Sequence, residues 1–332
     1  MLDESSLLFL LIVIALAVGF DFVNGWTDAC NAIATVISTR VMTPRAALLL
    51  AAVFNFLGAL SGTAVAKTIG TGLISSKALT LSTVAAALAA SILWSFFATY
   101  FGLPTSKSHE LVAGLAGAGI AAAGWDIFIW SGWRKILTGL AFGPFFGLTV
   151  GLLVMVAILW LFRRKTPSAV GGLFRRLQVL SASFMAFSHG SNDAQKTMGV
   201  ITMALVIHGT LDDFTVPLWV IALSAVTMAA GTAAGGWRVI RTVGMRITHL
   251  EPVHGFAAET SAALVIETAS RFGIPLSTTH VISTSIMGVG ASKRFSAVRW
   301  GVAGNIVAAW VLTFPACGIL AWILAHLLFV VT

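Results

Sequence analysis

Long apolar stretches dominate the chain, and short polar stretches separate them. A helix needs about 20 apolar residues to cross the hydrocarbon core of a bilayer. By this measure the sequence predicts an all-α polytopic membrane protein, with segments whose boundaries are loose by several residues. These segments lie at 5–38, 46–66, 79–101, 105–123, 135–162, 177–208, 216–236, 253–272, 274–291 and 301–330.

Two of these segments carry polar residues at membrane depth. The first contains Asp21, Asn24 and Asp28, and the sixth contains the polar run 189–196. Polar groups inside a bilayer are costly, and backbone that breaks at this depth usually lines a cavity. We therefore expect both segments to be broken helices.

The polar features recur in the same order in two halves of the chain. Residues 101–109 (FGLPTSKSH) match residues 272–280 (FGIPLSTTH), 171 positions later. Upstream, residues 22–31 align with residues 187–196, and each of these stretches contains an Asp at the same place. Two matches in the same order indicate a duplication.

The duplication predicts an N-terminal transmembrane repeat at 1–162, a basic linker at 163–176 and a C-terminal transmembrane repeat at 177–332. The linker carries Lys and Arg but no acidic residue, which is typical of a cytoplasmic loop. Counting crossings outward from it predicts repeats of inverted topology, with paired hairpin-like segments that meet near the midplane. Secondary transporters are built in this way, and their sites lie between the repeats.

Composition excludes several classes of function. The chain is 58% hydrophobic and 10% charged, with a mean hydropathy of +0.96, whereas soluble domains carry about 25% charged residues. A secreted scaffold, a nucleic-acid-binding domain and an ordinary soluble enzyme are therefore excluded, and we attribute the net charge of +8 to basic loops. No nucleotide-binding or metalloprotease motif is present. We expect neither an enzyme nor a cofactor other than bound Na⁺.

Two hydroxyl-rich motifs each follow a proline and open a new apolar run, where a helix N-terminus is expected. Unpaired N–H groups, the positive end of the helix dipole and hydroxyl donors together suit a tetrahedral oxyanion. The alternative is that the hydroxyls only cap these helices. The candidate substrate-binding residues in these motifs are Thr105, Ser106, Lys107, Ser108, Ser277, Thr278 and Thr279.

Carboxylate and amide side chains form a second group of candidates. Oxygen atoms of this kind bind Na⁺ or H⁺ in coupled transporters, and carboxylates inside a membrane are functional by default. The alternative is a structural polar network, including an ion pair of Glu267 with Arg271. The candidate cation-coupling residues are Asn24, Asp28, Asn31, Asp193, Gln195, Lys196 and Glu259, of which Asp28, Asn31 and Asp193 are candidate Na⁺ ligands.

With these motifs in view, the chain resembles the inorganic phosphate transporter (PiT) family. Residues 22–35 and 186–197 look like the two Asn-Asp signatures of that family, and the Pro-x-Ser-x-Ser/Thr-His motifs look like its paired hairpins. The likeness covers almost the whole chain. It implies a Na⁺- or H⁺-coupled symporter of inorganic phosphate with an inverted-repeat fold, in the lipid of the plasma membrane and often a homodimer.

The resemblance also implies roles for individual residues. Phosphate would be held by the hairpin hydroxyls and by Asn192, with Asp28, Asn31 and Asp193 near phosphate or the cation. This sequence departs from the family pattern at Lys196, where the usual residue is Asn. We hypothesise that a Lys ammonium replaces one coupling cation or contacts the anion directly.

The departures have a structural alternative. Lys107 stands where the second half has Thr278, and Glu110 follows it by three positions. Both lysines can snorkel, or pair with Glu110 or an Asp.

Three other functions stay open from the sequence. Sulfate or another tetrahedral oxyanion would use the same helix ends. Ser106 and His109 would be the reactive pair of an intramembrane hydrolase. A passive anion channel would move substrate without any ion gradient.

Overall fold

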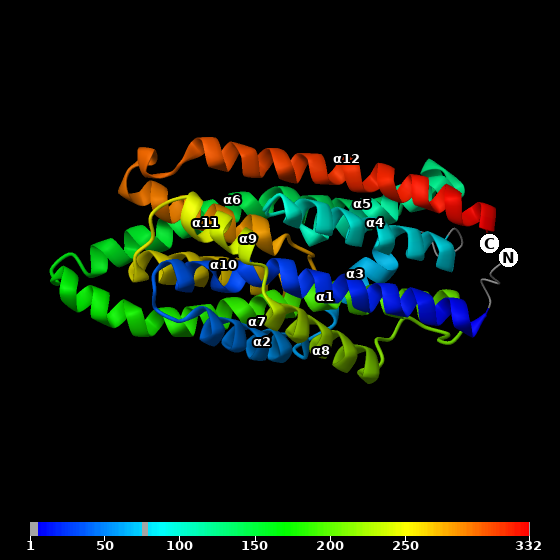
Figure 1. Ribbon diagram of the computed structural model, residues 1–332, viewed down its shortest axis with the longest axis horizontal. Helices are drawn as coiled ribbons and strands as arrows, with labels where there is room; N and C mark the ends of the chain where they lie inside the picture. Colours follow the sequence, from blue (N-terminus) through cyan, green and yellow to red (C-terminus); the bar gives the residue numbers. More distant parts are fainter. Residues whose placement is uncertain (1–5, 75–78, 332) are drawn as a thin grey trace.

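The computed structural model describes residues 6–74 and 79–331, and every regular element in these ranges is helical. The helices form an elongated bundle in which α1 begins at the end where α12 finishes (Figure 1). The first half contains α1 (Leu7–Ser38), α2 (Pro44–Ala59), α3 (Ala64–Gly72), α4 (Leu81–Tyr100), α5 (Lys107–Ala123) and α6 (Trp130–Leu161). The second half contains α7 (Pro167–Ile207), α8 (Leu218–Ala234), α9 (Trp237–Arg241), α10 (Pro252–Arg271), α11 (Thr278–Lys293) and α12 (Trp300–Val331).

The order of elements recurs between the halves. Helix α4, a turn, α5, a short 3₁₀ turn and α6 are followed in the second half by α10, a turn, α11, a short 3₁₀ turn and α12. Helices α10 and α11 begin 171 positions after α4 and α5, the spacing of the duplicated motifs. We call α4–α5 the first hairpin and α10–α11 the second hairpin.

The two halves interlock. Helix α6 packs against α11 of the other half, and α12 packs against α5. Close approach of α6 to α11 depends on glycines spaced four residues apart, because a Cβ at Gly147 or Gly151 would lie 2.6 Å from a carbonyl oxygen of α11. The ridge of small residues is therefore a packing surface.

The prediction of broken helices in the first and sixth segments is wrong. Helix α1 is continuous over Leu7–Ser38, and α7 is continuous over Pro167–Ile207. Several of their buried polar side chains bond to other helices, as Asp21 does to Thr197 and Asp28 to Thr279, and the backbone keeps its helical hydrogen bonds. The bends lie elsewhere: α2 meets α3 at 68°, and α8 meets the segment 238–246 at 68°.

Helix α7 also begins earlier than predicted. It starts at Pro167, after Thr166 accepts a hydrogen bond from the backbone N–H of Ala169. Proline in the first turn and Thr at the cap favour this start. Most of the predicted linker 163–176 is therefore the first part of a helix.

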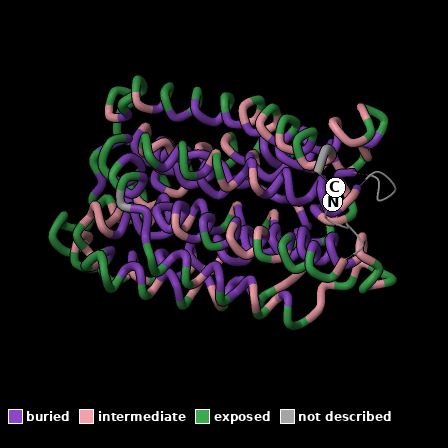
Figure 2. The backbone as a smooth tube through the Cα atoms, turned by 45° about the vertical axis from the view of Figure 1, so that its right-hand side comes forward, coloured by how far each residue is buried: buried purple, intermediate pink, exposed green. Residues whose placement is uncertain are grey.

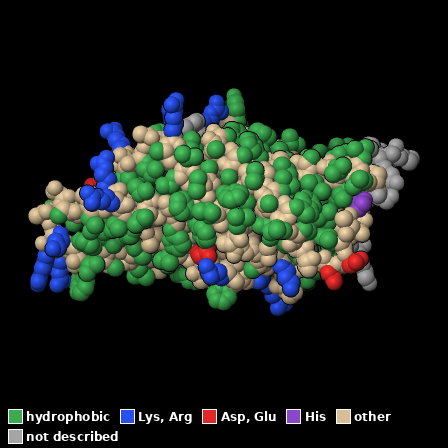
Figure 3. Space-filling model, turned by 90° about the horizontal axis from the view of Figure 1, so that it is seen from below, with side chains coloured by type: hydrophobic (Ala, Val, Ile, Leu, Met, Phe, Trp, Pro, Cys, Tyr) green, Lys and Arg blue, Asp and Glu red, His purple; other side chains and the backbone are tan. Residues whose placement is uncertain are grey.

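The surface is that of a multi-pass membrane protein. In the described residues α1, α4, α6 and α12 are each long and apolar enough to span a bilayer, and each bent pair adds one span if counted as a unit. Helices α5 and α11 have 17 and 16 residues, fewer than the roughly 20 needed. Buried residues line the interior (Figure 2), and apolar side chains cover much of the outer face (Figure 3).

Candidate functional site

The polar centre of the molecule lies where α1, α7 and α11 meet. On α1, the residues Asn24, Asp28 and Asn31 recur at helical spacing and share one face. All three are buried. The continuous helix therefore presents a stripe of amide and carboxylate groups toward its neighbours.

Asp28 is surrounded by neutral donors. Its Oδ2 atom accepts hydrogen bonds from Thr279 Oγ1 at 2.9 Å and from Asn31 Nδ2 at 3.0 Å. Asn31 Nδ2 also lies 3.0 Å from Thr279 Oγ1 and 3.3 Å from Thr278 Oγ1. The start of α11 thus joins directly to the middle of α1.

Asp193 on α7 has a different environment. Lys196, one turn later, donates from Nζ to Asp193 Oδ1 at 2.6 Å, and both side chains are buried. The other carboxylate oxygen lies 3.5 Å from Thr278 Oγ1 and 3.8 Å from His189 Nε2. The alternative suggested for Lys196, pairing with an Asp, is therefore present in the structure.

The two carboxylates approach each other closely. One ligand atom each from Asp28, His189 and Asp193 fall within 4.8 Å of one another. Nearby side-chain oxygens of Asn24, Asn192 and Asp21 are buried and have no hydrogen-bond partner in the described residues. Carboxylate and amide oxygens of this kind suit a monovalent cation.

In the first hairpin the charged side chains form hydrogen bonds within the hairpin. Lys107 Nζ lies 2.8 Å from Glu110 Oε1 and 2.9 Å from Ser95 Oγ. Thr105 donates to Glu110 at 2.7 Å, and Ser95 also donates to that carboxylate. Lys107 is therefore paired with Glu110, as the structural alternative predicted.

Helix N-termini stand at both motifs, as predicted. Ser106 Oγ accepts from the backbone N–H of His109 at 3.2 Å, and Ser277 Oγ accepts from that of His280 at 3.3 Å. These two hydroxyls cap their helices, which is the simpler of the two roles considered. Ser106 contacts the backbone of His109 and not its ring, so this bond is not that of a hydrolytic dyad.

The two hairpins touch at their turns. Ser108 Oγ donates to the carbonyl oxygen of Leu276 at 2.5 Å, and the rings of His109 and His280 lie 4.6 Å apart. His280 stacks on Trp310 at 3.8 Å. The N-terminal ends of α5 and α11 therefore meet beside the carboxylates of α1 and α7.

Glu259 lies in a separate polar cluster. It accepts hydrogen bonds from Thr35, Ser181 and Gln178, the last at 3.1 Å. Gln178 in turn accepts from Thr39 at 2.9 Å. None of these partners contacts Asp28 or Asp193 in the hydrogen bonds described, so Glu259 is not part of the central group.

Gln195 and Asn192 donate or accept hydrogen bonds outside the central carboxylates. Gln195 Oε1 accepts from the backbone N–H of Val65 at 2.8 Å, which ties α7 to the start of α3. Asn192 donates to Ser270 at 2.8 Å. Beside them a polar cavity of about 310 Å³ is lined by Ser61, Gly62, Ala64, Ser191, Gln195, Glu267, Ser270 and Arg271.

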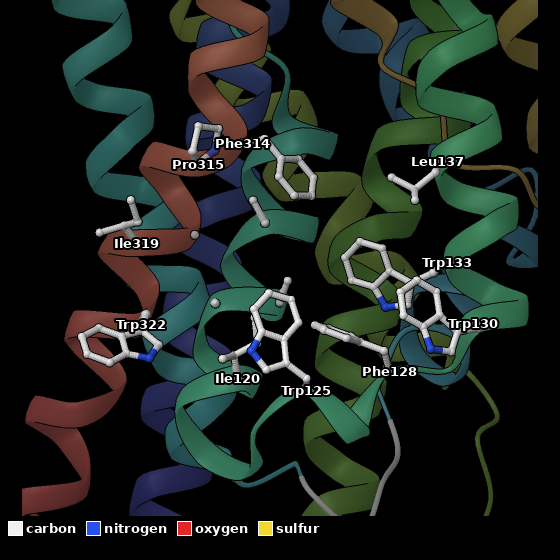
Figure 4. A pocket seen from close by; sticks show the side chains of 14 residues that line it. Ile120, Trp125, Phe128, Trp130, Trp133, Leu137, Phe314, Pro315, Ile319 and Trp322 are labelled. Atoms are coloured by element: carbon white, nitrogen blue, oxygen red, sulfur yellow. The ribbon is translucent and has the colours of Figure 1, made fainter.

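At this cavity the predicted ion pair is formed, with Arg271 Nε 3.0 Å from Glu267 Oε1. A larger apolar cavity of about 590 Å³ lies between α5, α6 and α12 and is lined by aromatic side chains (Figure 4). It carries no charged lining residue and suits lipid rather than an anion.

Several residues of the site had no distinct sequence signal. Ser95 is one of many serines in the apolar segments, and nothing in its local sequence marks it. Thr197, which donates to the buried Asp21 at 3.0 Å, is equally unmarked. His189 was visible only as part of the polar run on α7. Only the packing of helices distant in sequence identifies these contacts.

Comparison with known proteins agrees with the geometry. Residues 24–321 match the family described as "Phosphate transporter family". Over 322 residues, 96% of each chain, the sequence is 47% identical to a Rhizobium meliloti protein named "Probable low-affinity inorganic phosphate transporter". A Bacillus subtilis protein of the same name is 40% identical over 99% of this chain and all of that protein.

A solved structure shares the fold. The structure titled "The sodium-dependent phosphate transporter" superposes with a TM-score of 0.91 at 25% identity, covering 98% of this chain and all of the other. The resemblance and the prediction of an all-α polytopic membrane protein are therefore confirmed. This chain belongs to the phosphate transporter family.

Proposed function

We propose that the protein is a symporter that carries inorganic phosphate together with Na⁺ or H⁺ across the plasma membrane by alternating access. The observation that carries this proposal is the meeting of two helix N-termini, from α5 and α11, beside Asp28 and Asp193. Helix N-termini attract an oxyanion, while the buried carboxylates attract a cation or proton. Anion and cation would therefore bind as one coupled group.

The negative charge of phosphate opposes its import into a negative interior, and coupling to a cation offsets this cost. Moving one charge against 100 mV costs about 2.3 kcal/mol. Import of divalent phosphate into a negative interior thus costs about 4.6 kcal/mol at that potential, before any concentration gradient. Two monovalent cations would cancel this cost, whereas one is enough for monovalent phosphate. A passive channel offers no such compensation.

The neighbouring carboxylates favour phosphate over sulfate. A protonated phosphate can donate a hydrogen bond to Asp28 or Asp193, but sulfate at neutral pH has no proton to donate. Placing sulfate there would leave a carboxylate facing an anion without a proton between them. This argument supports the substrate named for the relatives.

We propose that the end of the molecule that carries the connection between α6 and α7 faces the cytoplasm. Basic residues gather there, with Arg163, Arg164, Lys165, Arg175 and Arg176 near this connection. Positive charge favours the cytoplasmic side. Inverted repeats, a homodimer and contacts with membrane lipid belong to the same proposal.

Radiolabelled phosphate uptake into proteoliposomes tests the proposal, with Na⁺ and pH gradients imposed separately and sulfate as competitor. We expect one gradient to drive accumulation, and we expect the isosteric variant Asp28→Asn to abolish it. Gly304→Ala is a matched control, because a Cβ there meets open space. Flux that persists without either gradient and never accumulates phosphate would contradict symport, and accumulation of sulfate instead would contradict the substrate.

A further inference from the structure

The Asp motifs of α1 and α7 differ at a position that changes the local charge. Asp28 is followed three residues later by Asn31, and Asp193 is followed three residues later by Lys196. Both of these side chains donate to their own Asp, Asn31 at 3.0 Å and Lys196 at 2.6 Å. The geometry is shared, but only the α7 motif supplies a positive charge.

The Asp193–Lys196 pair is neutral as a unit and is fully enclosed. Both side chains are about 1% exposed, so neither charge is screened by water. A buried ion pair of this kind persists because removing either partner leaves a charge without compensation. The ammonium contacts Asp193 Oδ1 at 2.6 Å and so takes up an oxygen that a mobile cation would need.

Asp28 has no directly bonded ammonium, and the Lys107 charge acts on it only from its own pair with Glu110. Thr27, Asn31 and Thr279 are its hydrogen-bond donors, and all three are neutral. In the described part of the chain no Lys or Arg forms an ion pair with Asp28. A buried carboxylate among neutral donors needs a mobile cation or a proton.

We propose that Lys196 is a permanently attached cation that occupies one of two pseudo-equivalent cation positions. This inference rests on the symport proposed above. Transport then requires one exchangeable cation fewer per phosphate than an arrangement with Asn at both positions. The exchangeable cation or proton binds on the Asp28 side, while Lys196 balances the charge of Asp193 throughout the cycle.

The charge carried per phosphate tests this role. Purified protein is placed in proteoliposomes with equal Na⁺ and equal pH on both sides, a fixed gradient of radiolabelled phosphate and a membrane potential set by K⁺ and valinomycin. The potential at which net phosphate flux stops reports the net charge moved with each phosphate. We expect Lys196→Asn to move one more positive charge per phosphate than the unmodified protein.

Lys293→Asn is the matched control, because this lysine lies at the far end of α11 and is 43% exposed. We expect it to leave the charge per phosphate unchanged. If Lys196 instead contacts phosphate directly, Lys196→Asn raises the KM for phosphate without changing the charge. That result overturns the inference.

A binding measurement keeps the test decisive if Lys196→Asn folds, as judged by size-exclusion chromatography, but does not transport. Binding of radioactive ²²Na⁺ and uptake of protons, followed with a pH dye, are summed for the detergent-purified proteins. The variant is expected to bind one more cation in total than the unmodified protein, and an unchanged total overturns the inference. If the unmodified protein does not accumulate phosphate, the symport proposal fails, while the cation count still decides the role of Lys196.

Discussion

The two hairpins share their sequence pattern and their order of elements, yet they use their polar groups differently. In the first hairpin Lys107 is held by Glu110 at 2.8 Å, within the hairpin itself. In the second hairpin Thr279 reaches out to Asp28 on α1 at 2.9 Å. The charged pair of the first hairpin stays within that hairpin, and Ser108 reaches only the turn of the second hairpin. The second hairpin instead completes a site with α1.

The difference shows how a duplicated fold divides its tasks. Positions 107 and 110 carry a charged pair in the first half, and the equivalent positions 278 and 281 carry Thr and Val. The order and spacing of the elements are the same, and the side chains at these positions form different contacts. Four predictions follow this contrast, beginning with the largest expected effect.

The first prediction concerns Glu110→Gln, which leaves the buried Lys107 ammonium without a counter-charge. Breaking a buried pair in this way costs roughly 3–5 kcal/mol. We expect a large fall in thermal stability in detergent. The double variant Lys107→Thr with Glu110→Val introduces the residues of the second hairpin and is expected to be less destabilised. If Glu110→Gln is as stable as the double variant, the buried ion pair does not contribute to stability.

Next, Thr279→Val removes a hydroxyl that donates to Asp28 and accepts from Asn31. A buried group left without its partner costs about 1–3 kcal/mol, which corresponds to a rise of roughly 5- to 150-fold in the KM for phosphate. Thr105→Val is the comparison in the first hairpin, because its hydroxyl binds Glu110. We expect that change to lower stability more than affinity, and similar KM values for both would contradict the contrast.

The third prediction uses two glycines at equivalent places in α6 and α12. A Cβ at Gly147 would lie 2.4 Å from the Thr284 hydroxyl and 2.6 Å from the Val281 carbonyl oxygen, whereas a Cβ at Gly318 would lie 3.5 Å from its nearest neighbour. Gly147→Ala is expected to cost about 1–3 kcal/mol through overpacking, with Gly318→Ala close to neutral. Thermal unfolding of the two variants measures the loss of stability. Equal losses would show that the α6–α11 contact is no tighter than the α12–α5 contact.

The smallest effect is expected at the hairpin turns. Thr68 of α3 donates to the carbonyl of Gly273 at 2.7 Å, and Thr242 donates to that of Gly102 at 3.0 Å. Each half thus holds the turn of the other half's hairpin. Replacing either Thr with Val removes one hydrogen bond, which lowers the stability of that contact by about 0.5–1.5 kcal/mol. If the repeats are inverted, the two variants shift the protein toward conformations that open to opposite sides of the membrane.

Labelling measures this last prediction. A cysteine at Ser191, which lines the polar cavity, is introduced after both native cysteines are changed to Ser. A membrane-impermeant maleimide is then applied from each side of the vesicle. Shifts of labelling in the same direction for Thr68→Val and Thr242→Val would contradict inverted repeats.

Helix starts were readable from local sequence. Pro104 and Pro275 precede capping serines, and α5 and α11 begin just after them, because proline and an N-cap act within one turn. The breaks were misplaced for the converse reason. The polar residues of α1 predict a break by local pattern, but Asp21 bonds to α7 and Asp28 to α11, and no local pattern reveals partners so distant.

The candidate site shows the same division. Asp28, Asn31, Thr278 and Thr279 were all identified from motifs, and the structure brings them together. Glu259 was also a candidate, yet it lies in a separate cluster with Gln178 and Ser181. Residue type alone does not distinguish one buried carboxylate from another.

Membrane class, family and repeat order depended only on hydropathy and motif spacing, which are properties of the linear chain and need no partner to be recognised. The pairs Lys196–Asp193 and Lys107–Glu110 lie three residues apart on one helix, so helix geometry already brings each pair within reach. The contact of Thr279 with Asp28 depended on packing. Burial by the surrounding helices is what only the tertiary structure decided for the two lysines, because it removes the water that would otherwise solvate each charge. Thr279 and Asp28 lie 251 positions apart, and their hydrogen bond forms only because the folded chain brings α11 against α1.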